Sequence, residues 1–334
     1  MSSVMTRRSV LAGGIAAAVL SAAAFVPPGL AAGRAVRIGL LKFGTVNWEI
    51  DTLMRNGLDE AHGIELEVVD LASNQATQIA LQSGAVDVIV SDWLWVARQR
   101  AAGEALSFIP YSTSVGAVVV PADSDIRTVG DLAGRRIGIA GSPLDKGWLM
   151  LRALARDRYG IDLETQASPF FGAPAVMSEQ IRAGRLDGVL NYWHYAARLE
   201  AEGMRRLIDV GEIQRDLGIT VEVPAIGYVF KESWAEADPG RVGRFAAASA
   251  AAKQRLLESD EEWERLRPLV RAEDDATLSV LRDRYREGIP RHWGQAEREA
   301  AADLFALMAK LGGRDLVGDA TALPEGTFWP GVAY

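Results

Sequence analysis

The sequence contains no cysteine among its 334 residues. Disulfides, thiolate metal sites and a lipid-bearing cysteine near the N-terminus are therefore excluded. Histidine is scarce as well: only His62, His194 and His292 occur. None of them has metal-ligand spacing or stands with a serine and a carboxylate in a recognisable triad pattern. No glycine-rich phosphate loop ending in Lys-Ser or Lys-Thr is present. These absences predict a protein that is not an enzyme and uses no metal and no cofactor.

The sequence also lacks a basic stripe, and its net charge is −8. Binding to nucleic acid requires many phosphate-neutralising side chains, so no nucleic-acid partner is expected. After the first thirty or so residues there is no apolar run of the roughly 20 residues that a bilayer requires. We therefore expect no membrane span once the N-terminal segment is removed.

The N-terminal segment has the pattern of a signal peptide. Arg7 and Arg8 follow Thr6, an apolar, alanine-rich run continues to Val26, and small residues follow as far as Ala31. The arginine pair resembles a twin-arginine export signal. The apolar run is short for a permanent anchor. We expect residues 1–31 to be the signal, cleavage near Ala31, and export to the periplasm.

The remaining chain alternates between β-type and helical segments. This alternation predicts an α/β fold made of βαβ units with parallel sheets. From Asp238 onward the pattern is mostly helical. The expected strands are Ala35–Leu41, Ile64–Leu71, Val86–Ser91, Leu106–Tyr111, Arg135–Gly141, Leu186–Asn191 and Arg205–Val210.

One stretch occurs twice in similar form, one hundred residues apart. Gly84–Gly103 reads GAVDVIVSDWLWVARQRAAG, and Gly184–Gly203 reads GRLDGVLNYWHYAARLEAEG. Matching positions are Gly84/Gly184, Asp87/Asp187, Trp93/Trp193, Ala97/Ala197, Arg98/Arg198, Ala101/Ala201 and Gly103/Gly203. The aspartates begin their strands and are expected to be structural, and the arginines are expected to make surface or inter-element salt bridges. The tryptophans follow the strand ends, where ligands bind in open α/β sheets.

The repeat predicts two similar α/β lobes. The apolar segments Gly116–Asp125 and Val223–Ser233 are expected to connect them. Lobe 1 then comprises residues 35–119 and 228–334, and lobe 2 comprises residues 120–227. A chain that crosses twice forms a two-segment hinge, and closure of two lobes on a ligand is a known hinge motion.

Four segments carry a resemblance to a known family. They are IGLLKFGTVNWEIDTL (Ile38–Leu53), IALQSGAVDVIVSD (Ile79–Asp92), TVGDLAGRRIGIAGSP (Thr128–Pro143) and QIRAGRLDGVLNYWHYAARL (Gln180–Leu199). The chain resembles ABC-importer substrate-binding proteins of the nitrate/sulfonate/taurine group, which includes SsuA-like and NMT1-like proteins and binders of thiamine-pyrimidine precursors. The resemblance implies a type II periplasmic binding protein fold. It also implies a monomer that delivers a small-molecule solute to an ABC permease and its ATPase.

The resemblance places ligand-binding residues in the strand-end loops and at the hinge. The implied positions are Thr45, Asn47, Trp48, Ser91, Asp92, Trp93, Ser142, Asn191, Tyr192, Trp193 and Tyr228. Trp95 and Trp148 are expected to belong to the core instead. Ser142 has another reading, as a helix N-cap followed by Pro143 at the first helical position and Asp145 at the third. Lys146 either pairs with Asp145 or reaches the cleft.

Asp92 departs from the anion-binding members of that group. A carboxylate about 4–5 Å from a sulfonate costs roughly 1 to 4 kcal/mol. With the nearby tryptophans, Asp92 therefore favours a heteroaromatic or amine-bearing solute. Two alternatives stay open at this site: Asp92 only caps a helix, or the solute is a sulfonate or nitrate attracted by helix N-termini.

Two alternatives of another class remain for the whole protein. The same two lobes would serve a binding protein that reports to a sensor, and nothing in the sequence separates that role from import. An enzyme on the same fold is the other alternative, which the absences described above disfavour.

Overall fold

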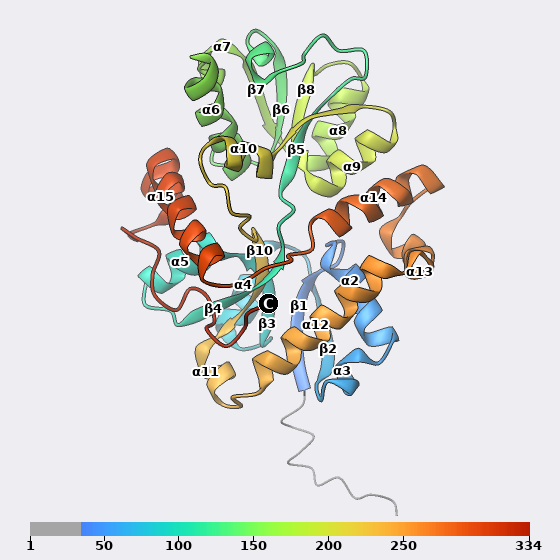
Figure 1. Cartoon of the computed structure of the whole chain (residues 1–334), viewed down its shortest axis with the longest axis vertical. Helices are drawn as coiled ribbons and strands as arrows, with labels where there is room; N and C mark the ends of the chain where they lie inside the picture. Colours follow the sequence, from blue (N-terminus) through green and yellow to red (C-terminus); the bar gives the residue numbers. More distant parts are fainter. Residues whose placement is uncertain (1–34) are drawn as a thin grey trace, which may run out of the picture. The chain divides into compact units, whose positions relative to one another are not determined.

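The computed structural model describes residues 35–334, whose strands form two five-stranded sheets (Figure 1). The predicted signal peptide, residues 1–31, lies outside the described residues. The first sheet has the order β2-β1-β3-β10-β4. Its strands are β1 (Ala35–Leu41), β2 (Glu65–Leu71), β3 (Val88–Asp92), β4 (Leu106–Ser112) and β10 (Ile226–Lys231). The second has the order β7-β6-β8-β5-β9. Its strands are β5 (Gly116–Val120), β6 (Arg136–Ala140), β7 (Ser168–Gly172), β8 (Gly188–Tyr192) and β9 (Arg205–Asp209).

The two sheets have the same strand order and the same strand directions. In each, the first three strands are parallel, and the fourth, β10 or β5, runs antiparallel to both of its neighbours. The predicted parallel arrangement therefore holds for every strand of each sheet except β10 and β5. The physical reason is that β10 and β5 are the strands by which the chain enters a sheet from the other lobe.

The predicted boundaries between the lobes differ from the structure for the same reason. Gly116–Asp125 was expected to be a connection, but Gly116–Val120 is fully buried and pairs with β8 and β9. The chain therefore crosses before Gly116, not after Val119. Val223–Ser233 likewise contains β10, which begins at Ile226 in the first sheet.

Helices cover the faces of the sheets. Against the first sheet and each other pack α2 (Val46–Arg55), α3 (Leu58–Ala61), α4 (Asn74–Ser83), α5 (Trp93–Ala101), α11 (Glu232–Glu236), α12 (Arg241–Glu258) and α13 (Asp260–Val270). The second sheet carries a 3-10 turn (Val129–Leu132), α6 (Lys146–Tyr159), α7 (Leu163–Gln166), α8 (Pro174–Arg182), α9 (Trp193–Ala201) and α10 (Val210–Asp216). The last two helices reach both lobes: α14 (Asp275–Glu287) packs on α9, and α15 (Gln295–Val317) packs on α5 and α6.

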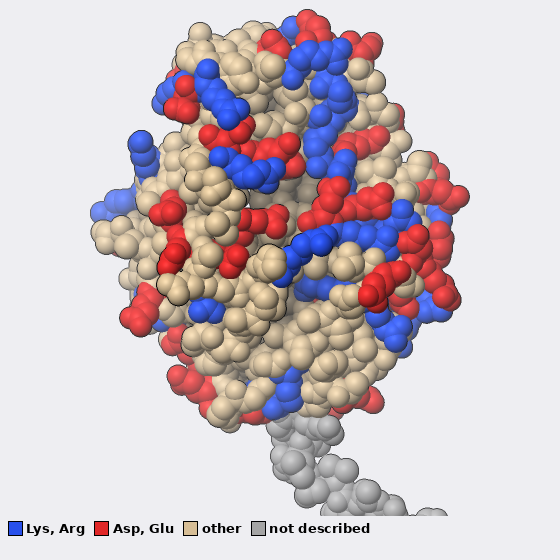
Figure 2. Space-filling model, in the orientation of Figure 1, with Lys and Arg blue, Asp and Glu red and all other residues tan. Residues whose placement is uncertain are grey.

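The C-terminal helices follow the apolar spacing that predicts them. In α12 the buried residues Val242, Phe245, Ala248, Ala252 and Leu256 recur every three or four positions and form one face. Around α13 and α14, acidic and basic side chains alternate on the surface (Figure 2). Many of them pair, for example Arg267 with Glu264 and Asp275. Within residues 35–334, no helix combines the length and apolar character required to cross a bilayer.

The repeated aspartates are structural, as predicted. Asp87 accepts hydrogen bonds from the backbone N–H and the guanidinium of Arg37 at the start of β1. Asp187 makes the same bonds to Arg136 at the start of β6. Each pair therefore fixes the start of β1 or β6 to the residue that precedes the neighbouring strand, β3 or β8.

Candidate functional site

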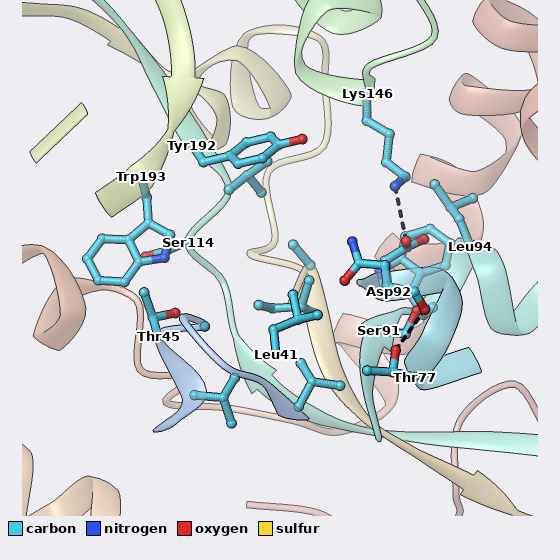
Figure 3. A pocket seen from close by; sticks show the side chains of 18 of the residues that line it. Leu41, Thr45, Thr77, Ser91, Asp92, Leu94, Ser114, Lys146, Tyr192 and Trp193 are labelled. Atoms are coloured by element: carbon cyan, nitrogen blue, oxygen red, sulfur yellow. Dashed lines mark hydrogen bonds and ion pairs between the residues drawn. The ribbon is translucent and has the colours of Figure 1, made fainter. Parts of the chain in front are cut away.

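A cavity of about 370 Å³ lies where the carboxyl ends of strands from both sheets meet. Figure 3 shows side chains reaching into it from both lobes. Its polar lining residues are Thr45, Asn47, Asn74, Thr77, Gln78, Ser91, Asp92, Ser114, Asp145, Lys146, Tyr192, His194 and Gln214. Its larger apolar lining residues are Leu40, Leu41, Val46, Val90, Trp93, Leu94, Val115, Met150, Trp193, Ile226, Leu304 and Met308. We call it the aromatic cavity.

Most of the predicted site residues meet in this cavity. The first loop contributes Thr45 and Asn47, the end of β3 and start of α5 contribute Ser91, Asp92 and Trp93, and the end of β8 contributes Tyr192 and Trp193. Both tryptophans of the repeat therefore face the same space from opposite lobes.

Tyr228 and Trp48 do not line the cavity, contrary to prediction. Tyr228 is fully buried in β10, and its hydroxyl donates to Glu49 Oε1 at 2.7 Å. Trp48 follows Asn47, which lines the cavity, but Trp48 itself is buried. Its ring makes edge contacts with Trp193 and Trp263. Both side chains point into the core of the first lobe because they lie on the inner faces of their elements.

Asn191 and Ser142 were also predicted to be site residues, and the structure places both outside the cavity lining. Asn191 is buried, and its amide donates to Pro174 O and Ser178 Oγ, both at 3.0 Å. In a strand, neighbouring side chains point to opposite faces, so Asn191 faces the core while Tyr192 faces the cavity. Ser142 is exposed, and it accepts from the backbone N–H of Leu144 in a turn. The α6 N-cap is Asp145, which accepts from the backbone N–H of Trp148. The predicted capping role of Ser142 is therefore also wrong.

Asp92 has two partners in the structure. Its Oδ1 accepts from the backbone N–H of Trp95 at 2.9 Å and so caps α5. Its Oδ2 lies 3.2 Å from Lys146 Nζ, which comes from the start of α6 in the other lobe (Figure 3). The predicted cap is confirmed, and of the two possibilities for Lys146 the structure selects the one that reaches the cleft. The ion pair joins the lobes across the cavity.

The ion pair also decides the charge state of Lys146. Burial, the largest single cause, would lower the pKa of this ammonium group, and the charge of Asp92 and its hydrogen bond raise it. Asp145 and Tyr192 act in the same direction, and the pKa of Lys146 is raised overall. Lys146 is therefore a cation at neutral pH.

Aromatic rings form one side of the cavity. Trp193 lies with its centroid 5.7 Å from Trp48 and 6.3 Å from Tyr285, so its ring is held by the first lobe although it belongs to α9 of the second. Trp93 packs edge-on against Phe328 at 6.0 Å. Tyr192 is 39% exposed and extends across the top of the cavity in Figure 3. This arrangement offers aromatic faces to a flat solute. Of the other tryptophans, Trp148 is buried and Trp95 is partly buried against the core, as predicted.

His194 is a lining residue without a charge at neutral pH. Burial lowers its pKa to about 4, and the positive charge of Arg198 is the smaller cause. Its Nδ1 is buried and has no hydrogen-bond partner among the described residues. It is the one histidine in the cavity lining, and within residues 35–334 no group of three or more His, Cys, Asp or Glu side chains could hold a metal ion.

A buried charged cluster lies behind α2, whose first turn lines the cavity. Glu49 is fully buried, and its Oε2 lies 2.7 Å from Lys253 Nζ on α12. Ser249 and Tyr228 donate hydrogen bonds to Glu49 Oε1 at 2.6 and 2.7 Å. Lys253 also lies 4.8 Å from the Tyr111 ring centroid, a cation–π contact. This cluster fixes α2 to α12 and β10.

Several lining residues were not predicted from the sequence. Asn74, Thr77 and Gln78 come from the first turns of α4, after β2, and Ser73 caps that helix as a serine before a helix commonly does. That cap was a usable signal for one more strand-end loop. Leu304 and Met308 of α15 carried no such signal, because they read as ordinary core positions of an amphipathic helix.

Comparisons with known proteins agree with this architecture. A model of the family described as NMT1/THI5 like matches residues 56–262. The chain is similar to the alkanesulfonate-binding protein SsuA from Xanthomonas axonopodis pv. citri bound to MOPS, with 20% identity and a TM-score of 0.64, over 89% of this chain and 98% of that one. It is also similar to the periplasmic aliphatic sulphonate binding protein SsuA from Escherichia coli, with 19% identity and a TM-score of 0.68, over 89% of this chain and 97% of that one. The desulfurization enzyme DszB is similar with 16% identity and a TM-score of 0.59, over 88% of this chain and 97% of that one. Comparison with curated protein sequences gives no match. The solved structures establish a type II periplasmic binding protein fold for the described residues.

Proposed function

Since the chain belongs to the NMT1/THI5-like family, we propose that it is the solute-binding component of an ABC importer. In this role it is exported to the periplasm, captures a small organic solute as a monomer, and delivers it to a permease and its ATPase. The observation that supports this is the aromatic cavity, which both lobes line. A solute held there contacts both lobes and so favours the form in which they are close together.

A heteroaromatic or amine-bearing solute fits the lining best. Trp93, Tyr192 and Trp193 offer aromatic surface, and Asp92 and Asp145 offer negative charge. Lys146 is the one basic side chain in the described lining that is charged at neutral pH, and it is already paired with Asp92. An anion would have to compete with Asp92 for that ammonium group.

A sulfonate or nitrate is the second candidate, and one observation favours it. The N-termini of α2 and α9 have no side-chain cap, and their N-cap residues, Thr45 and Tyr192, line the cavity. Uncapped helix N-termini attract anions. Lys146 also neutralises Asp92, so the repulsion expected from that carboxylate is weaker than for an isolated charge. The two SsuA proteins, named for sulfonate binding, support the same alternative.

Two roles of another class remain as alternatives. A binding protein that reports to a sensor would use the same cavity. An enzyme is also represented on this fold by DszB. Its counterpart here would depend on His194, whose Nδ1 has no hydrogen-bond partner among the described residues. Solute uptake by a reconstituted permease that depends on this protein would separate import from both.

Thermal unfolding of residues 32–334 against a panel of solutes tests the proposal. The panel contains aminopyrimidines and other heteroaromatics, amines and betaines, alkanesulfonates including taurine, and nitrate. A ligand at a hundredfold over its Kd stabilises by about 2.7 kcal/mol, which raises Tm by a few degrees at this size. Shifts with ring or amine compounds alone support the favoured class, and shifts with sulfonates or nitrate support the second candidate. The absence of any shift contradicts small-solute binding.

The variant Tyr192→Ala tests whether the aromatic cavity is the binding site. We expect it to reduce the affinity for a hit from the panel about tenfold, because it removes an aromatic face from the lining. Phe170→Ala is the matched control: Phe170 is an aromatic residue of the same lobe, 50% exposed and outside the cavity. Equal loss in both variants, or loss in neither, would place the solute elsewhere.

A further inference from the structure

A second cavity, of about 430 Å³, adjoins the aromatic cavity. The two share Gln78, Asp92, Leu94 and Lys146 as lining residues, so the ion pair between the lobes belongs to the wall between them. The second cavity is otherwise lined by Gln82, Trp95, Arg98, Gln99 and Leu316. We call it the glutamine cavity, because it presents three glutamine amides.

We infer that the glutamine cavity binds an acidic group at one end of the solute, a carboxylate, sulfonate or phosphate, and that Arg98 selects for that group. The inference rests on the proposed function, in which the rest of the solute occupies the aromatic cavity. It extends that function from a ring or amine binder to a binder of elongated solutes with an acidic end.

The distribution of charge carries the inference. The aromatic cavity is lined by the carboxylates of Asp92 and Asp145 and by one charged ammonium group, that of Lys146. The glutamine cavity is lined by Asp92 and by two cations, Lys146 and Arg98. Positive charge therefore dominates in the second cavity and negative charge in the first. A solute with a neutral or basic ring at one end and an acid at the other matches this polarity.

Arg98 is available for such a group. Its side chain is exposed, and within residues 35–334 no carboxylate lies within 4.0 Å of its guanidinium. The salt bridge expected of Arg98 from the sequence is therefore not made by the described residues. A guanidinium binds carboxylate, sulfonate and phosphate oxygens through paired hydrogen bonds.

The equivalent arginine in the second copy of the internal repeat is bound to the protein itself. The corresponding residue, Arg198, donates hydrogen bonds to the backbone carbonyls of Arg271 and Val270 at 3.1 and 2.6 Å. Arg198 thus ties α9 to the end of α13, a structural role that Arg98 does not share. The stem of Arg98 lies beside Gly318, where a Cβ atom would be in van der Waals contact with Arg98 Cγ at 3.5 Å.

The glutamine amides complete the lining. Gln82 Nε2 donates to Gln99 Oε1 at 3.1 Å. This bond uses only the amide oxygen of Gln99, so the two N–H donors of the same amide take no part in it. Amide donors beside two cations suit an oxyanion with several acceptor lone pairs. A ring, by contrast, finds only Trp95 and two leucines here.

Three small probes, two of them matched in size, test the inference by calorimetry. They are 4-(aminomethyl)phenylacetic acid, its carboxamide, and benzylamine, which has neither group. We expect the acid to bind the wild-type protein about tenfold more tightly than the carboxamide, and this ratio to fall to about one in Arg98→Gln. Arg98→Lys keeps the charge and is expected to retain part of the preference. Arg185→Gln, which removes an exposed arginine of the other lobe that lines neither cavity, is the control and keeps the wild-type ratio.

The outcomes separate this inference from the proposed function. If the acid and the carboxamide bind equally, or if Arg98→Gln keeps the ratio, the glutamine cavity does not select an acid, and the importer role is untouched. If none of the three probes binds, the inferred solute class is wrong, while the wider panel still tests solute binding itself. The unfolding temperature of ligand-free Arg98→Gln verifies folding, and we expect it to equal that of wild type because Arg98 is exposed.

Discussion

At the scale of single residues, His194 is a group whose protonation is disfavoured by folding. It lines the aromatic cavity, and its pKa is lowered from 6.5 to about 4 by burial and by Arg198. The unfolded chain therefore binds a proton below pH 6.5 that the folded protein does not take up until about pH 4. Stability due to the neutral imidazole is complete above pH 6.5 and is lost as the pH falls from 6.5 to 4.

We expect the free energy of unfolding to fall by about 2–3 kcal/mol more across that interval in wild type than in His194→Gln. Urea unfolding at several pH values between 4 and 7 measures the difference. His62→Gln serves as the control, because His62 lines neither cavity. Parallel pH profiles for wild type and His194→Gln would show that His194 titrates normally.

At the scale of elements, α2 is held by charge as well as by apolar packing. Glu49 and Lys253 are buried, and their ion pair joins α2 to α12. Burial lowers the pKa of Lys253, and Glu49 opposes this by stabilising the ammonium form. The helix that brings Thr45 and Asn47 to the cavity is thus positioned by a cluster one turn further along.

Removing one partner of this pair leaves the other charge buried and alone. We expect Lys253→Met to cost about 3–5 kcal/mol of unfolding free energy. The double variant Glu49→Gln/Lys253→Met should cost less than Lys253→Met alone, because it removes the uncompensated carboxylate. Denaturant titration of the two variants decides this, and a double variant less stable than the single one would show that the pair itself supplies the stability.

The same scale shows what the sequence could and could not predict. The parallel strands and the loops after β1, β3 and β8 were predictable, because apolar runs and the repeat mark them. The strands β5 and β10 were mistaken for connections, since a short apolar run reads alike in both, and their partners are distant in sequence. Asn191 was misplaced because strand-end position does not reveal which face a side chain takes. Tyr228 was misplaced because its segment was expected to be a hinge, whereas it lies inside β10. The pairing of Lys146 with Asp92 depends on the approach of two lobes, which no local pattern records.

At the scale of the whole molecule, the Asp92–Lys146 pair links the lobes at the cavity. We expect Lys146→Met to shift the ligand-free protein toward more open forms, by up to about fivefold in the ratio of the two, since a partly exposed pair is worth under about 1 kcal/mol. Single-molecule energy transfer between dyes at Glu65→Cys and Ser168→Cys measures this, and with no native cysteine these are the chain's two thiols. Lys310→Met, an exposed lysine on α15, is the control. An unchanged distribution in Lys146→Met would mean that other contacts set the lobe separation.

The exchange of strands between the sheets has a consequence for synthesis on the ribosome. In the first sheet, β3 and β4 both pair with β10, which begins only at Ile226. The second sheet has all of its strands once Asp209 has emerged. The sheet of the first lobe is therefore incomplete, with the position between β3 and β4 unfilled, while the sheet of the second lobe is completed. During translation the nascent chain holds an unfinished sheet edge for the length of more than one hundred residues, from the end of β4 to the start of β10, and a chaperone that shields such an edge would act in that interval.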